Sequence, residues 1–74
     1  MLAAPPEELL AEHEALDQLA VEDPSAAELV KLRYFMGMTM EEAAGAMGLA
    51  TRSAERIWTF ARVWLKRQIR EMQG

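Results

Sequence analysis

Few side chains in this sequence have the types and spacing that chemistry requires. The chain has one histidine, His13, and no cysteine, so we expect no metal site. Glu41 and Glu42 form a carboxylate pair, but neighbouring residues of a helix point about 100° apart, which separates them for acid–base work. Glycine-rich phosphate loops, nucleophile elbows and serine–histidine–aspartate sets are missing from the sequence. We therefore expect no enzyme activity and no cofactor, and we expect His13 to be a structural or surface residue.

The basic residues follow a more informative pattern. At about 100° per residue, one set from the last third of the chain falls within a sector of about 100° on a helix. The set comprises Arg52, Arg56, Thr59, Lys66, Arg67 and Arg70. Such a helix can pack by its apolar face and offer guanidinium groups to phosphates and guanine edges by the other. A solvated surface helix is the simpler explanation of such a stripe when it stands alone.

Charge is divided unevenly along the chain. Residues 1–30 contain eight acidic residues and no Lys or Arg, whereas residues 31–74 contain eight basic and four acidic residues. The formal net charge of −4 and the pI of about 4.9 therefore conceal a C-terminal part with a balance of +4. A domain with this asymmetry can present one face to a polyanion although its overall charge is negative.

Length and composition indicate one small globular domain. The chain has 74 residues, of which 51% are hydrophobic and 27% charged, a composition typical of a folded protein. The absence of cysteine fits a reducing compartment, and no stretch approaches the roughly 18 apolar residues of a membrane span. The N-terminus also lacks the basic and apolar regions of a signal peptide. We expect a cytoplasmic domain that contacts no membrane and binds no small-molecule ligand.

Hydrophobic spacing and capping residues predict four helices and no strand. The helices are expected over about residues 6–20, 24–36, 40–47 and 51–72. Asp23 is the expected N-cap of the second helix, and Thr39 with Glu42 has the form of a capping box for the third. Gly37 and Gly48 stand where the second and third helices should end.

Each helix is expected to turn an apolar face inward. The expected faces are Leu9, His13, Leu16 and Ala20 in the first helix, Leu29, Leu32 and Phe35 or Met36 in the second, and Ala54, Ile57, Trp58, Ala61, Leu65, Ile69 and Met72 in the last. Gly45, inside the third helix, suggests close packing at that point.

The third and fourth helices have the pattern of a helix-turn-helix over about residues 39–60. Ala44 would stand where the two helices cross, Gly48 in the turn, and Ala54 and Ile57 on the inward face. The expected fold class is therefore all-α: a compact four-helix domain containing a helix-turn-helix with a long C-terminal recognition helix. In that context the basic stripe favours DNA binding over a merely solvated face.

The order of these motifs resembles region 4 of a bacterial sigma factor, and more narrowly of the extracytoplasmic-function (ECF) group. The resemblance covers about residues 9–70. It is carried by Leu16-x-x-Leu19-Ala20-x-x-Asp23-Pro24, by Leu29-Val30-x-Leu32-Arg33-Tyr34-Phe35-x-Gly37-x-Thr39-x-Glu41-Glu42-Ala43-Ala44 and by Ala61-Arg62-x-Trp64-Leu65. The resemblance implies a helical domain that reads the −35 promoter element with its last helix and docks on the flap of the RNA polymerase β subunit. An anti-sigma factor is a further candidate partner.

Carried over position by position, the resemblance implies a set of DNA-binding residues. Arg52, Ser53, Glu55 and Arg56 would face the major groove, with Thr51 beside them at the start of the helix, and Lys31, Arg33 and Thr39 would contact phosphates. Arginine can bridge O6 and N7 of guanine, and a glutamate can accept a hydrogen bond from the amino group of cytosine.

Two positions depart from the family pattern. Ala50 stands where serine commonly caps the recognition helix, so the helix begins either directly after Ala50 or one residue later, with Thr51 as its cap. Glu55 stands where a basic residue is frequent, which weakens the attraction to phosphates. Nothing in the chain resembles region 2, which melts the −10 element in this family. We therefore expect either a fragment of a sigma factor or a free-standing relative.

Two other functions fit the same residues. The chain could be mainly a protein-interaction module for polymerase or anti-sigma docking, in which the Met36 and Phe60 side chains rather than Arg56 carry the binding. It could also be a helix-turn-helix transcriptional regulator that works as a dimer, with Phe60 and Trp64 as its contact surface.

Overall fold

The computed structural model describes the backbone of residues 7–73 and the side chains of residues 13–72. These residues form helices α1 (Glu7–Glu22), α2 (Pro24–Tyr34), α3 (Met40–Met47) and α4 (Thr51–Gln73). The described part of the chain contains no strand, so the predicted all-α, four-helix class is confirmed. The expected start of the first helix at residue 6 and the side chain of Leu9 lie outside the described residues.

Two helix ends differ from the prediction. α1 continues past Ala20 to Glu22, and the amide of Asp23 still donates to the carbonyl of Leu19 over 2.7 Å. α2 ends at Tyr34, so its predicted continuation to residue 36 is wrong. The amides of the next two residues both donate to the carbonyl of Lys31, and Gly37 then reverses the chain at a φ of 67°. A positive φ costs glycine little, which explains why the chain reverses at this residue.

The predicted caps are present. The side chain of Asp23 accepts the amide of Ala26 over 3.2 Å at the start of α2. At the start of α3, the amide of Thr39 donates to the Glu42 carboxylate over 2.9 Å, and the amide of Glu42 donates to the Thr39 hydroxyl over 3.1 Å. Gly48 ends α3 at a φ of 71°. These bonds satisfy amides and carbonyls that a helix terminus would otherwise leave free.

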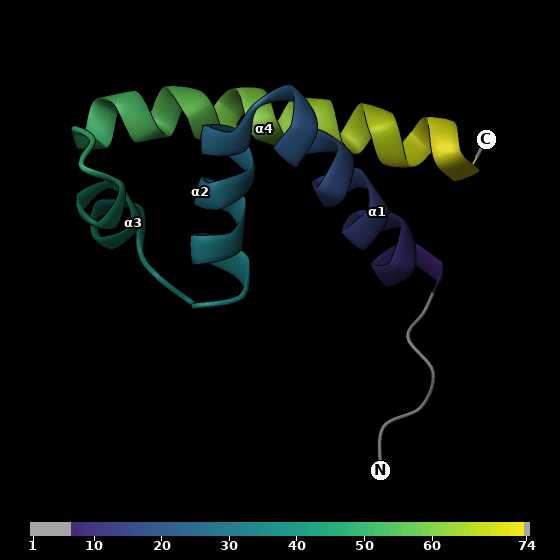
Figure 1. Cartoon of the computed structure of the whole chain (residues 1–74), viewed down its shortest axis with the longest axis horizontal. Coiled ribbons are helices and arrows are strands. Elements are labelled where there is room, and N and C mark those ends of the chain that lie inside the picture. Colours follow the sequence, from purple (N-terminus) through teal and green to yellow (C-terminus); the bar gives the residue numbers. More distant parts are fainter. Residues whose placement is uncertain (1–6, 74) are drawn as a thin grey trace, which may run out of the picture.

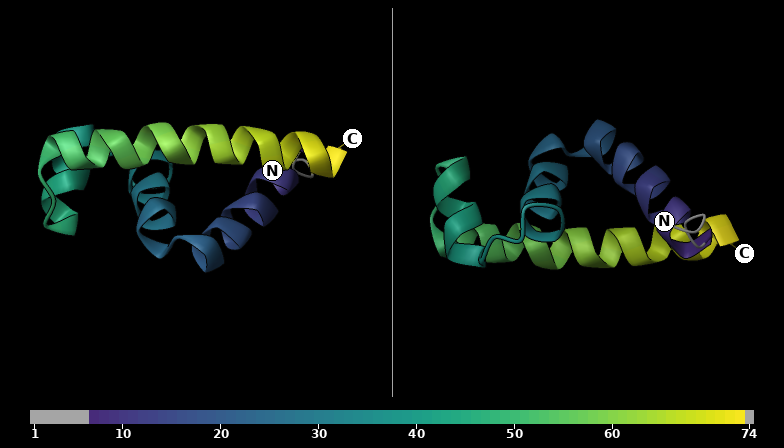
Figure 2. Two further views of the ribbon diagram at one scale, coloured as in Figure 1. Left: turned by 90° about the horizontal axis from the view of Figure 1, so that it is seen from above. Right: turned by 90° about the horizontal axis from the view of Figure 1, so that it is seen from below.

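α4 forms the long axis of the domain, and the other helices pack along it (Figure 1). α1 and α2 form a V that contacts α4, with α1 toward the C-terminal half of α4. α3 lies at the N-terminal end of α4 and also contacts α2 (Figure 2). The acid-rich first helix therefore lies far from the first turns of α4.

The core consists of two clusters that meet on α4. The first joins α1, α2 and α4 through the buried residues Leu16, Leu19, Ala26, Ala27, Val30 and Ala61. The second joins α2, α3 and α4 through the buried residues Leu29, Ala43, Ala44 and Ala54. Ile57 and Trp58 are half-buried and pack against both clusters. The predicted inward face of the last helix is confirmed at these positions.

The packing at three places differs from what the sequence suggested. Phe35 and Met36 are exposed, at 56% and 66% of their surfaces, because α2 ends before them. His13 follows the apolar spacing of α1, but it is exposed, as its assignment as a structural or surface residue allowed, and its ring stacks on Phe35 with centroids 5.7 Å apart. Gly45 is exposed, and a Cβ added there would have no atom within 4 Å, so no neighbouring backbone requires glycine at this position.

None of the described helices is long and apolar enough to cross a bilayer.

Candidate nucleic-acid interface

α3, the short turn at residues 48–50 and α4 form a helix-turn-helix arrangement. The two helices meet through Ala43, Ala44 and Ala54, which are at most 1% exposed. Small side chains allow two helix backbones to approach closely. The predicted positions of Ala44 at the crossing and Ala54 on the inward face are confirmed. The contact fixes the direction in which the first turns of α4 point.

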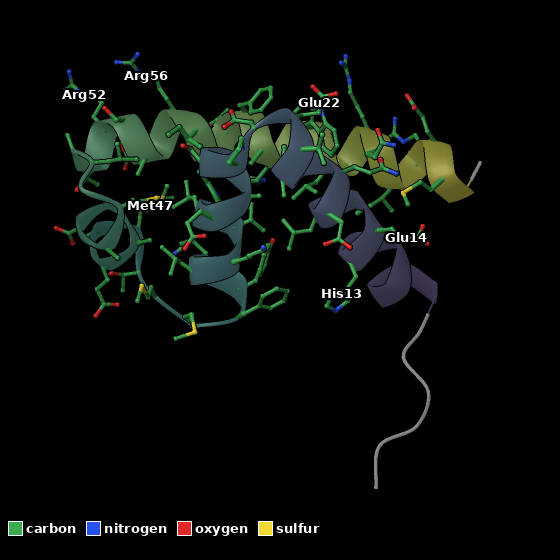
Figure 3. All side chains as sticks on the ribbon, in the orientation of Figure 1. His13, Glu14, Glu22, Met47, Arg52 and Arg56 are labelled. Carbon is green, nitrogen blue, oxygen red and sulfur yellow. The ribbon has the colours of Figure 1, made fainter. Side chains whose placement is uncertain are left out.

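The outer face of α4 carries the basic residues near its N-terminus. Arg52 and Arg56 are exposed and project from α4 on the side away from α2 and α3 (Figure 3). Glu55 is exposed beside them, whereas Thr51 and Ser53 are half-buried. The two arginines lie one turn apart, since they are four residues apart on a helix. This end of α4 thus offers two adjacent guanidinium groups to an approaching ligand.

The start of α4 settles which residue caps it. α4 begins at Thr51, and the amide of Ala54 donates to the carbonyl of Ala50 over 3.1 Å. Ala50 is therefore the N-cap, and it has no side-chain oxygen to accept an amide of the first turn. The sequence left two starts open, one directly after Ala50 and one after Thr51, and the structure has the start directly after Ala50.

The three residues assigned to phosphates have different surroundings. Lys31 and Thr39 are exposed. The hydroxyl of Thr39 accepts the amide of Glu42, but its proton remains free to be donated. Arg33 is half-buried, its Nη1 donates to the carbonyl of Met38 over 3.1 Å, and its guanidinium carbon lies 4.9 Å from the centre of the Trp58 ring. The structure thus brings Lys31 and Thr39 to the surface and places Arg33 against the core.

A groove between α1, α2 and α4 is a feature that sequence reasoning missed. It has a volume of about 490 Å³, and its apolar lining includes Tyr34, Phe35, Trp58, Leu65 and Ile69. The exposed cations Arg62 and Lys66 also line it. The available signal was the pair of adjacent aromatic residues Tyr34 and Phe35. Phe35 was expected on the buried face because α2 was expected to extend to residue 36.

The described residues also show how the other chemistry-bearing side chains are distributed. No group of three histidine, cysteine, aspartate or glutamate side chains within the described part of the chain could hold a metal ion. The carboxylate of Glu42 is engaged in the capping box, as the spacing predicted.

The sequence of this chain matches a known protein family over almost its whole length. A family model described as "ECF sigma factor" matches residues 1–71. The chain belongs to the ECF sigma factor family. Members of this family are transcription initiation factors and not enzymes, which agrees with the expectation drawn from the sequence. No curated protein and no solved structure matches the chain.

Membership of the ECF sigma factor family implies RNA polymerase and promoter DNA as partners. For an ECF sigma factor, the helix-turn-helix arrangement of α3 and α4 and the exposed basic end of α4 are compatible with DNA binding. The groove between α1, α2 and α4 is a second surface, on the inner side of α4, and it is separate from Arg52 and Arg56.

Proposed function

We propose that residues 1–74 form a single region 4-like domain that recognises the −35 promoter element and docks on the β flap of RNA polymerase. The observation that carries this proposal is the outward projection of Arg52 and Arg56 from the first turns of α4, while α3 holds the opposite face of the helix (Figure 3). A recognition helix enters the major groove in this manner, with residues of its N-terminal turns at the base edges.

In the proposed complex, residues 39–60 form the helix-turn-helix that contacts DNA. Arg52 and Arg56 donate to guanine O6 and N7, and Glu55 accepts from a cytosine amino group. Thr51 and Ser53, which are half-buried, contact the edges of the groove through their hydroxyl groups. The acidic residues of α1 lie toward the other end of α4, which limits their repulsion of the phosphates.

Phosphate contacts orient the domain on the duplex in this proposal. Lys31 and Thr39 are exposed and can contact the backbone from the α2 and α3 side. Such contacts fix the register of a protein on DNA without reading sequence. Together with the arginines of α4 they account for binding that weakens as salt rises.

The groove between α1, α2 and α4 supports the docking part of the proposal. Its aromatic and aliphatic lining suits an apolar segment of the β flap, and the exposed Arg62 and Lys66 suit acidic residues on the flanks of that segment. Because the groove lies on the inner side of α4, the polymerase and the promoter can be bound at the same time. An anti-sigma factor that covered this groove would compete with the polymerase. Because RNA polymerase and promoter DNA are both in the cytoplasm, the domain is expected to act there.

Fluorescence anisotropy with a labelled promoter duplex tests the DNA-binding part. With about three phosphates neutralised, affinity should fall about 40-fold between 50 and 200 mM salt. The double variant Arg52→Glu/Arg56→Glu should bind much more weakly, since losing a base-contacting arginine costs about 1–3 kcal/mol. Its matched control is Arg67→Glu/Arg70→Glu, which makes the same change of charge on exposed residues at the other end of α4.

The two double variants separate site-specific binding from general attraction to a polyanion. If both lose affinity equally, net charge rather than the first turns of α4 governs binding. If the wild-type domain does not bind at low salt while it remains helical by circular dichroism, promoter recognition by this domain is wrong. The protein-interaction module is then the function to pursue, with the groove as its site.

Sedimentation that shows a stable dimer would instead favour the dimeric regulator, since Phe60 is 48% exposed on the outer face of α4.

A further inference from the structure

Arg33 lies in a position that a phosphate contact does not explain. It is the second-last residue of α2, and it is half-buried, whereas Lys31 on the same helix is exposed. Residues two apart on a helix point about 200° apart, so Lys31 and Arg33 face nearly opposite directions. Only one of these two cations therefore faces outward at this end of α2.

The guanidinium of Arg33 is engaged within the protein. Its Nη1 donates to the carbonyl of Met38 over 3.1 Å, and its guanidinium carbon lies over the ring of Trp58, 4.9 Å from the ring centroid. Its Nε is buried and has no hydrogen-bond partner among the described residues. A charge held in this way is stabilised by the face of the indole and by the carbonyl dipole.

These contacts connect three parts of the domain. Met38 directly precedes Thr39, the N-cap of α3, and the amide of Met38 also bonds to the carbonyl of Leu32 in α2. Trp58 is on α4 and packs against both core clusters, and the centroids of the Trp58 and Tyr34 rings are 5.7 Å apart. One guanidinium group therefore joins the end of α2, the chain entering α3, and the middle of α4.

We propose that Arg33 is a positioning residue that sets the orientation of α3 against α4 and that it does not contact DNA phosphate. This replaces the role that the family resemblance implied for it. The effect on DNA rests on the proposed function, because a shift of α3 against α4 matters there only if α4 reads DNA. The positioning itself does not depend on DNA and has readouts of its own.

Lysine and arginine differ in the two roles, and this difference provides the test. A phosphate contact needs mainly a positive charge, which lysine supplies. The contacts of Arg33 need one group that lies over the Trp58 ring and at the same time donates an N–H to the carbonyl of Met38, and the compact ammonium of lysine does not reproduce this fork. We therefore compare Arg33→Lys and Arg33→Gln, with Lys31→Gln as the variant that removes a phosphate contact.

Anisotropy with promoter DNA gives the first measurement. Arg33→Lys and Arg33→Gln are each expected to lose affinity about tenfold, to within twofold of one another, with the salt slope of the wild type. Lys31→Gln is expected to lower the slope by about 0.9. The proposal is overturned if Arg33→Lys binds like the wild type while Arg33→Gln lowers the slope, because that is the behaviour of a phosphate contact.

The second measurement uses the free protein. In proton–nitrogen correlation spectra, both Arg33 variants should shift the Trp58 indole and Thr39 amide resonances, and the Trp64 indole should stay in place as an internal control. Both variants should also lower Tm by about 5–10 °C. Unchanged Trp58 and Thr39 resonances together with an unchanged Tm would overturn the proposal. If the wild type fails to bind DNA, the proposed function is wrong. The spectra and Tm values of the free protein still test the positioning role of Arg33.

Discussion

The amide of Ala54 donates to the carbonyl of Ala50 over 3.1 Å, which makes an alanine the N-cap of the helix that carries Arg52 and Arg56. Three other helix termini follow familiar rules: Asp23 and Thr39 accept amides, and Gly48 closes α3. At the first turn of α4, the N-cap residue has no side-chain oxygen that could accept an amide. Its position depends instead on the packing of Ala54 in the cluster shared with α2 and α3.

Replacing Ala50 by serine should therefore stabilise the domain. A serine hydroxyl at the N-cap can accept an amide of the first turn, which contributes about 0.5–2 kcal/mol. Ala50 is exposed, so the hydroxyl has space. Urea unfolding followed by circular dichroism measures the change. The control is Ala46→Ser, an exposed position inside α3, where serine should lower stability slightly. Equal effects at the two positions would mean that capping is not the cause.

The glycine inside α3, Gly45, and the glycine that caps it, Gly48, should respond in opposite directions to alanine. Gly45 is exposed, has no positive φ and has no atom within 4 Å of an added Cβ, so Gly45→Ala should stabilise the domain by about 0.8–1 kcal/mol. Gly48 has a φ of 71°, so Gly48→Ala should destabilise it by about 1–2 kcal/mol. Thermal unfolding of both variants checks this pair. Loss of stability in Gly45→Ala would show that glycine is required there after all.

A larger side chain at Ala54 should separate α3 from α4. Ala54 is fully buried between Ala43 and Ala44, so Ala54→Leu should cost about 1–3 kcal/mol through overpacking. Chemical denaturation measures the loss. Ala46→Leu adds the same atoms at an exposed position of α3 and should leave stability nearly unchanged. A tolerated Ala54→Leu would indicate that the two helices are less closely packed than the structure shows.

The groove can be tested at Phe35 with little risk to the fold. Phe35 is 56% exposed, lines the groove and stacks on His13, so Phe35→Ala removes apolar contact area from the proposed docking surface. Calorimetric titration with the isolated β-flap domain should show about tenfold weaker binding, as for a central aromatic contact. Val21→Ala, at a position 85% exposed and outside the groove lining, is the control. If both variants bind the flap alike, docking uses another surface.

Much of this architecture was predictable because local rules determine it. The capping box of Thr39 and Glu42, the closing glycine at residue 48 and the inward positions of Ala54 and Ala61 all follow from spacing along the chain. These features depend on contacts between residues close in sequence or on helical periodicity. Such signals survive in a single sequence.

The features that were missed depend on contacts between distant elements. Phe35 continues the apolar spacing of α2, but the helix ends at Tyr34, so periodicity was extended too far. The groove exists only because α1 and α2 diverge along α4, and no spacing rule contains the angle between two helices. Arg33 looks like a free cation in the sequence, and its position over the Trp58 ring depends on tertiary packing. Each of these features depends on residues that lie on another helix or in a loop.

The sharing of Ile57 and Trp58 by both core clusters has a consequence for how the domain unfolds. With so few large side chains in either cluster, neither the α1–α2 pair nor the α3–α4 pair can retain a core once the other has separated. The domain should therefore open as one cooperative unit, and the amides of α3 should exchange with solvent at the rate set by global opening. The proposed promoter-reading element therefore exists only while the whole domain is folded.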